Sequence, residues 1–174
     1  NASEQEILSL DKLAQTVVMT SQGVPFIFAG EELFRSKKGV HNSFNSPDSI
    51  NEINWLNKSK YNDLYQYYRG LIQLRKLHPA FRMGDAEMVR KHLHFLNFSD
   101  SCVVGFMLNG NANGDQAKDL IVVFNANRKA VTIDLDKCQW KVLVCDGKID
   151  VRGIKTINGG SVEIAPISAL ILEQ

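Results

Sequence analysis

The sequence has no surplus of either charge and no long apolar run. Its 20 lysines and arginines nearly balance 19 aspartates and glutamates, so the formal net charge is +1. This balance gives no electrostatic reason to expect a nucleic-acid partner or an anionic membrane surface. No apolar run reaches the roughly 18 residues that a bilayer-spanning helix needs, so we expect no membrane span.

Patterns typical of metal and cofactor sites are also missing. The three cysteines, Cys102, Cys138 and Cys145, fall in strand-like stretches without a CxxC pair, which is typical of small buried residues. The four histidines lack the spacing of zinc ligands, and no glycine-rich turn ends like a phosphate-binding loop. The sequence therefore predicts no metal site and no cofactor.

What is present begins with a helix, an apolar strand, a long loop and a second helix in residues 1–80. Residues 3–20 carry apolar side chains at helical spacing behind Ser3, a good helix cap. Residues 24–29 form a continuous apolar run, typical of a strand covered on both faces. Helical spacing returns in residues 61–77.

This first part is incomplete as a folding unit. A single parallel strand needs neighbours on both edges and helices on both faces. The chain also starts at Asn1 without a methionine or a signal-like segment. We therefore expect residues 1–80 to be the end of a (β/α)8 barrel, whose sites lie on the loops that follow the strands.

Residues 81–174 change to short β-rich runs separated by turn signals. Asn109-Gly110 and Asp146-Gly147 are typical of tight hairpin turns. This pattern predicts an antiparallel β-sandwich, so the fold class is α+β with a domain boundary near residue 80. The strands are expected at residues 92–98, 102–108, 120–125, 130–135, 140–145, 162–165 and 169–173.

The first part resembles a known family. Residues 21–32, SQGVPFIFAGEE, resemble the last barrel strand of the alpha-amylase superfamily, glycoside hydrolase family thirteen. The following FRSKK, the stretch NSFNSPDSIN at residues 42–51 and the Asn54-Trp55 pair are similar to the type I pullulanase version of that region. The later residues resemble the last barrel helix and the C-terminal β-sandwich, so the resemblance covers essentially the whole chain.

The resemblance implies a retaining glycoside hydrolase that cleaves α-1,6-glucosidic branch linkages in pullulan, starch or glycogen. The partner of the parent barrel is then an α-glucan polysaccharide. Such enzymes use two carboxyl groups about 5 to 5.5 Å apart. In this family those acids follow earlier barrel strands, and a third precedes the helix at Ser3. We therefore expect no catalytic residue here and an inactive fragment.

The loop of residues 33–60 carries side chains suited to sugar hydroxyls and rings. The resemblance implies that Asp48 contacts glucose units, with Asn45 and Arg35 as helpers. Asp48 also suits a turn or a helix cap after Pro47, and the two roles are compatible. These three residues are the candidate substrate-binding site.

Other residues near this loop have competing interpretations. Glu52 stands where relatives often have an arginine that pairs with the acid, and a like charge cannot clamp Asp48. Trp55 suits either loop packing or a position near substrate. Glu31 and Glu32 are sequence neighbours that point to opposite sides, so we expect them to support surrounding loops rather than act as a catalytic pair.

Two other functions stay open. An amylase-like or isoamylase-like relative would share the strand motif, and a non-catalytic carbohydrate-binding module would expose a row of aromatic residues on its sandwich. If residues 1–80 are part of a barrel, the faces of residues 3–20 and 24–29 that the rest of the barrel would cover are uncovered in this chain. We therefore expect them to be exposed or covered by a second copy, and we expect self-association.

Overall fold

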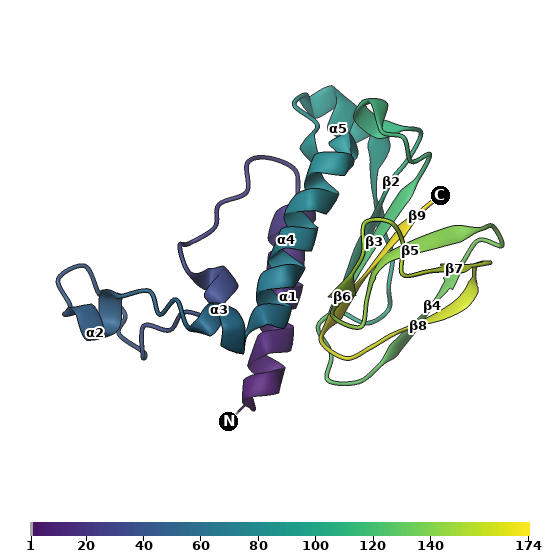
Figure 1. Cartoon of the computed structure of the whole chain (residues 1–174). Helices are drawn as coiled ribbons and strands as arrows, with labels where there is room; N and C mark the ends of the chain where they lie inside the picture. Colours follow the sequence, from purple (N-terminus) through teal and green to yellow (C-terminus); the bar gives the residue numbers. More distant parts are fainter. Residues whose placement is uncertain (1) are drawn as a thin grey trace.

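The computed structural model describes residues 2–174 and shows two parallel helices lying on one face of a large antiparallel sheet (Figure 1). A loop bearing a short helix projects away from this body on the side opposite the sheets. The helical elements are α1 (Glu4–Thr20), η1 (Glu31–Leu33), α2 (Asp48–Asn51), α3 (Asn57–Lys60), α4 (Asn62–Leu77), η2 (Pro79–Arg82), α5 (Ala86–His92) and η3 (Ala112–Gly114).

The two long helices confirm the predictions from periodicity. The Ser3 hydroxyl caps α1 by accepting a hydrogen bond from the Glu6 amide at 3.1 Å. The C-terminal end of α1 is held by Arg75 of α4, which is 6% exposed. Its guanidinium donates to the carbonyl oxygens of Met19 and Ser21 at 2.8 Å and of Gly23 at 2.5 Å. The bond to Met19 satisfies a carbonyl that the end of the helix leaves without a partner, and the other two hold the segment that follows the helix.

The strand predicted at residues 24–29 is wrong for this chain. The segment is extended but pairs with no strand among residues 2–174. Val24 is 96% exposed and Phe26 is 85% exposed. The physical reason is that a β-strand is stabilised by ladder hydrogen bonds to a neighbouring strand, and no described strand pairs with this segment.

The second half confirms an antiparallel β-sandwich. The larger sheet has the strand order β1-β2-β3-β9-β5-β6, with β7 also paired to β5, and β4 and β8 form a second sheet. All of these pairs are antiparallel. The strands are β1 (Leu93–Leu96), β2 (Val103–Leu108), β3 (Leu120–Asn125), β4 (Val131–Leu135), β5 (Trp140–Cys145), β6 (Lys148–Ile149), β7 (Lys155–Ile157), β8 (Gly160–Ile164) and β9 (Ser168–Glu173).

Several details differ from the prediction. Helix α5 was not expected, because it is a single short segment whose start is marked only by Asp85, which accepts from the Glu87 amide at 2.9 Å. The cysteines were expected to be buried, yet Cys102 is exposed and the other two are half-buried. Cys102 lies in the turn before β2, outside the sheet core.

Two apolar cores hold the molecule together. One lies between the long helices and the large sheet and includes Leu71 of α4, Val122 of β3 and Ile171 of β9, all fully buried. The other lies between the two sheets and includes Trp140 and Ile133. The first core joins residues from both sides of position 80, so the helices and the sheet share one apolar interior.

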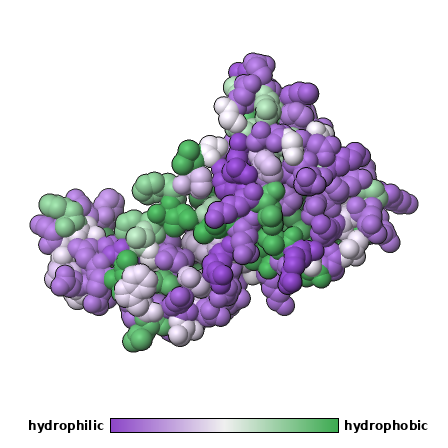
Figure 2. Space-filling view, turned by 45° about the horizontal axis from the view of Figure 1, so that its top comes forward, coloured by the Kyte–Doolittle hydropathy of each residue, from purple (hydrophilic) through white to green (hydrophobic). Residues whose placement is uncertain are grey.

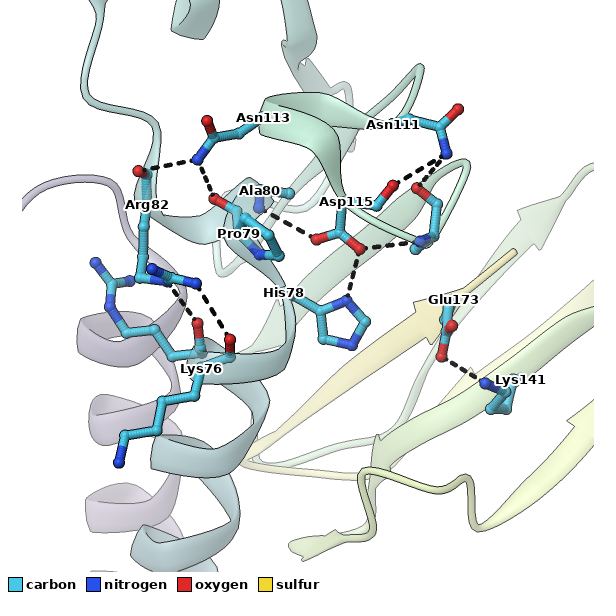
Figure 3. A network of polar contacts seen from close by, with 12 residues as sticks. Lys76, His78, Pro79, Ala80, Arg82, Asn111, Asn113, Asp115, Lys141 and Glu173 are labelled. Carbon is cyan, nitrogen blue, oxygen red and sulfur yellow. Dashed lines mark hydrogen bonds and ion pairs between the residues drawn. The ribbon is translucent and has the colours of Figure 1, made fainter.

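A polar network closes this interior at the exit of α4 (Figure 3). The Asp115 carboxylate accepts from the amides of Ala80 at 3.1 Å and Ala117 at 2.9 Å, and lies 3.1 Å from His78 Nδ1. Burial raises the pKa of Asp115, but these hydrogen bonds lower it more, so its pKa lies below the ordinary value. Asn113 adds a bond from its side chain to the Pro79 carbonyl. These hydrogen bonds therefore fix the loop around η3 to η2.

Candidate functional site

The candidate site lies on the projecting loop between η1 and α3, which carries α2 (Figure 1). Its base is set at Gly30, which has φ of 96°, in the left-handed region that favours glycine. A Cβ atom at Gly30 would lie 2.8 Å from Cδ of Arg35. The backbone turn and the close approach of Arg35 therefore both need glycine at this position.

Arg35 holds the base of the loop. Its Nη1 donates to the Ala29 carbonyl at 2.9 Å, its Nη2 donates to the Asn51 carbonyl, and its guanidinium lies 5.1 Å from the ring centroid of Phe28. These contacts tie the extended segment before the loop to the end of α2. Arg35 thus orients the loop, and two of its nitrogens are engaged with backbone.

Asn51 organises the rest of the loop. Its Nδ2 donates to the carbonyls of Ser43 at 2.7 Å and Ser46 at 2.8 Å, and its Oδ1 accepts from Lys37 Nζ at 2.6 Å. Asn51 was not among the site residues predicted from the sequence. Its signal was its place at the end of the NSFNSPDSIN stretch, and an asparagine among turn residues is suited to bond several backbone groups.

Asp48 and Asn45 lie on the outer side of this scaffold. Both are exposed, and among residues 2–174 neither side chain has a hydrogen-bond partner. Asp48 is the first residue of α2, whose cap position is Pro47, so its carboxylate does not cap the helix. The neighbouring Phe44 is 83% exposed. The loop therefore presents an aromatic ring, an amide and a carboxylate to solvent.

The loop lines a cavity that leaves two of the three candidate residues outside. This cavity measures about 360 Å³ and is lined by Arg35, Glu52 and Tyr61 among others, but not by Asn45 or Asp48. Trp55 is 69% exposed, so it does not pack within the described chain. The structure thus places the three candidate residues on one loop, with Arg35 inside and the other two outside.

Glu31 and Glu32 have supporting contacts. Glu31 Oε2 accepts from Gln15 Nε2 of α1 at 2.9 Å, and Glu32 Oε2 accepts from the Gly30 amide at 3.1 Å. Neither carboxylate forms an ion pair with Arg35, whose guanidinium bonds backbone carbonyls instead. The two acids help to hold η1 and the start of the loop.

The sandwich does not present an aromatic row. Phe106, Phe124 and Trp140 are buried and Phe98 is half-buried, which leaves Phe95 exposed at 71%. Within residues 2–174 no group of three or more His, Cys, Asp or Glu side chains could hold a metal ion. No helix in the same range is both long and apolar enough to cross a membrane.

Comparisons with known proteins agree with this architecture. A family model described as the pullulanase all-beta domain matches residues 89–148. The pullulanase of Bacillus subtilis (strain 168) is 38% identical over 138 residues, which cover 79% of this chain and 19% of that protein. The chain therefore spans about a fifth of the length of this curated relative.

Solved structures are similar over the whole chain. Pullulanase from Bacillus acidopullulyticus matches with a TM-score of 0.94 and 38% identity, covering 100% of this chain and 21% of that one. Pullulanase from Anoxybacillus sp. LM18-11, in complex with maltotriose, matches with a TM-score of 0.89 and 34% identity, covering 99% and 24%. The chain therefore belongs to the pullulanases, as a segment of a type I pullulanase-like protein that includes the all-beta domain.

Proposed function

We propose that this chain is the C-terminal part of a retaining, pullulanase-like glycoside hydrolase that cleaves α-1,6-glucosidic linkages in pullulan, starch or glycogen. The observation that carries the proposal is the match of 100% of the chain to a pullulanase at a TM-score of 0.94. Another matched pullulanase holds maltotriose, which supports an α-glucan as the partner of the parent protein.

Residues 1–80 are, in this proposal, the end of a catalytic (β/α)8 barrel, and residues 81–174 are the C-terminal β-sandwich. Along the chain, the parallel helices α1 and α4 come before and after an extended apolar segment. A barrel repeats this order of helix, extended segment and helix, which supports the assignment. The large sheet buries one face of the helix pair. Its role is then to cover and stabilise the flank of the barrel rather than to take part in the chemistry.

The fragment alone is proposed to be inactive. Retaining hydrolysis needs two carboxyl groups about 5 to 5.5 Å apart that face the same bond. Glu31 and Glu32 are engaged by Gln15 and by the Gly30 amide, and Asp48 lies outside the cavity that its own loop lines. The acids that perform the reaction belong to the remainder of the parent barrel.

The role proposed for the loop is substrate binding. Asp48 and Asn45 offer hydrogen-bonding groups that no described residue occupies, and Phe44 offers an exposed ring face. Arg35 contributes by holding the loop through the Asn51 carbonyl, and the N–H groups that its guanidinium has left are the donors it offers to the sugar. The three residues would then contact glucose units of an α-glucan.

Self-association is proposed for the isolated chain. Ile7, Leu10 and Val17 of α1 are 40% to 44% exposed, and Val24 and Phe26 are almost fully exposed. A second copy would cover these apolar side chains. Light scattering of the purified chain should give a mass above that of one copy, and a strictly monomeric chain would contradict this part of the proposal.

The function is tested by incubating this chain and its full-length parent with pullulan and measuring released reducing ends. The parent should release them and the chain should not. Asp48→Asn in the parent should lower kcat/KM on pullulan about tenfold or more, because a charged hydrogen bond to a sugar is lost. Asp134→Asn, an exposed acid on β4, is the matched control and should have no effect.

Three outcomes would count against the proposal. Release by the chain alone would place the chemistry within these 174 residues. Hydrolysis of linear amylose but not pullulan by the parent would favour the amylase-like alternative. An Asp48→Asn parent with unchanged kcat/KM would remove this residue from the substrate site.

A further inference from the structure

A group of acidic and amide side chains on one flank of α1 has no cationic partner among residues 2–174. Asp11 and Gln15 of α1 lie one helical turn apart and meet Glu31 of η1 and Tyr68 of α4. The Tyr68 hydroxyl donates to Asp11 Oδ1 at 2.6 Å, and Gln15 Nε2 donates to Glu31 Oε2 at 2.9 Å. Tyr68 is 2% exposed and Gln15 is 8% exposed, whereas both acids are half-buried.

Three acceptor atoms of this group remain without donors. Gln15 Oε1 is buried and has no hydrogen-bond partner. The second carboxylate oxygens, Asp11 Oδ2 and Glu31 Oε1, accept no bond from residues 2–174. Other acids near α1 are paired, since Asp63 lies 2.5 Å from Lys12 and Glu6 lies 2.5 Å from Arg128. A buried amide oxygen without a donor is uncommon in folded proteins.

The charges in the group are also unbalanced. Burial raises the pKa of Asp11, the hydrogen bond from Tyr68 lowers it, and the charge of Glu31 raises it again, with a net increase. Burial likewise raises the pKa of Tyr68, and the charges of Asp11, Glu31 and Glu32 raise it further. The tyrosine hydroxyl is therefore surrounded by negative charge that no lysine or arginine of the described chain offsets.

We propose that Asp11, Gln15 and Glu31 form the receptor for one arginine side chain contributed by polypeptide outside these 174 residues. A guanidinium has five donors in a planar fork, keeps its charge when dehydrated and can bond two carboxylates and an amide oxygen together. A lysine ammonium is a compact, strongly hydrated point charge and suits such a spread of acceptors less well. The inference rests on the proposed function, because the parent protein of that proposal contains the remainder of the barrel.

The surroundings of the receptor support a polypeptide partner. Ile7 and Leu10 lie four residues and one residue before Asp11 on α1 and are 44% and 43% exposed. Val24 and Phe26 precede Glu31 on the extended segment and are almost fully exposed. Figure 2 shows apolar side chains reaching the surface between the projecting loop and the main body. The partner therefore presents its arginine beside apolar side chains that cover this surface.

The test compares the double variant Asp11→Asn/Glu31→Gln in the full-length parent and in the isolated chain. Both substitutions keep an oxygen that can accept from Tyr68 and from Gln15. Unfolding in urea is followed by tryptophan fluorescence, so the readout does not depend on hydrolysis. The parent should unfold about tenfold faster, because charge-assisted bonds to the arginine are lost. The isolated chain should keep its urea midpoint or gain slightly, because repulsion between the acids is relieved.

The control removes the same two charges elsewhere, as Asp134→Asn/Glu163→Gln on the exposed side of β4 and β8, and should leave both proteins unchanged. An equal destabilisation of the isolated chain by Asp11→Asn/Glu31→Gln, or an unchanged unfolding rate of the parent, would overturn the proposal. Stabilisation of the wild-type chain by added CaCl2, absent in the variant, would also overturn it by showing that a metal ion occupies the group. A parent that unfolds faster as expected but does not act on pullulan would refute only the proposed function.

Discussion

Two apolar runs of similar composition have opposite fates in this molecule. Leu120 to Phe124 form β3, in which every side chain is at most 8% exposed. Residues 24–29 are equally apolar, yet Val24 is 96% exposed and Phe26 is 85% exposed. The difference is the neighbourhood: β3 pairs with β2 and β9, and cores lie on both of its faces. An apolar run is therefore stabilised by burial, but other segments of the chain decide whether it becomes buried.

The largest expected effect tests this comparison directly. Ile171→Ala in β9 removes a fully buried side chain beside β3 and should lower the free energy of unfolding by about 2 to 5 kcal/mol. Phe26→Ala in the same chain, diluted until it is a single copy, should change it by less than about 0.5 kcal/mol, because the ring of an unassociated chain is already in water. Urea denaturation of both variants gives the values. Similar losses for the two would show that Phe26 is buried in solution.

The second prediction concerns the junction between the helical part and the β-sandwich, where Asp115 lies. Asp115→Ala leaves the amides of Ala80 and Ala117 and the buried His78 ring without their acceptor, and should cost about 3 kcal/mol. Denaturation at neutral pH measures this cost. A loss below about 0.5 kcal/mol would mean that water replaces the carboxylate and that the η3 loop does not hold η2.

The same carboxyl predicts a pH dependence. The pKa of Asp115 is lower in the folded state than its ordinary value, so the folded state binds fewer protons than the unfolded state in acid. Its contribution is complete above the ordinary carboxyl pKa of about 4 and is lost as the pH falls through the folded value. Urea midpoints measured between pH 6 and about pH 2.5 should therefore fall less steeply for Asp115→Asn than for the wild type.

The smallest effect concerns the projecting loop. Asn51→Ala removes the bonds to Ser43, Ser46 and Lys37, so limited proteolysis within residues 36–56 should become about tenfold faster. The global urea midpoint should hardly change, because the loop lies outside both cores. Asp48→Asn is the control and should leave cleavage unchanged. Faster cleavage in both variants would mean that Asp48 also orders the loop.

The candidate site was predictable in part. The resemblance pointed to Arg35, Asn45 and Asp48, and the structure places them on one loop. It did not indicate that Arg35 is engaged with the carbonyls of Ala29 and Asn51. The role of Asn51 was missed because it consists of bonds to backbone groups five and eight residues away, and their positions follow from the fold of the loop.

By itself, the sequence determined the long helices and the main strands of this protein. The cap at Ser3, the apolar spacing of α1 and α4 and the β-rich runs with their turns depend on interactions between residues close along the chain, so each was predictable. The tertiary structure alone decided that residues 24–29 stay unpaired, that Arg75 holds the end of α1 and that Asp11, Gln15 and Glu31 meet. These outcomes depend on which distant segments come together, and composition and spacing do not specify that.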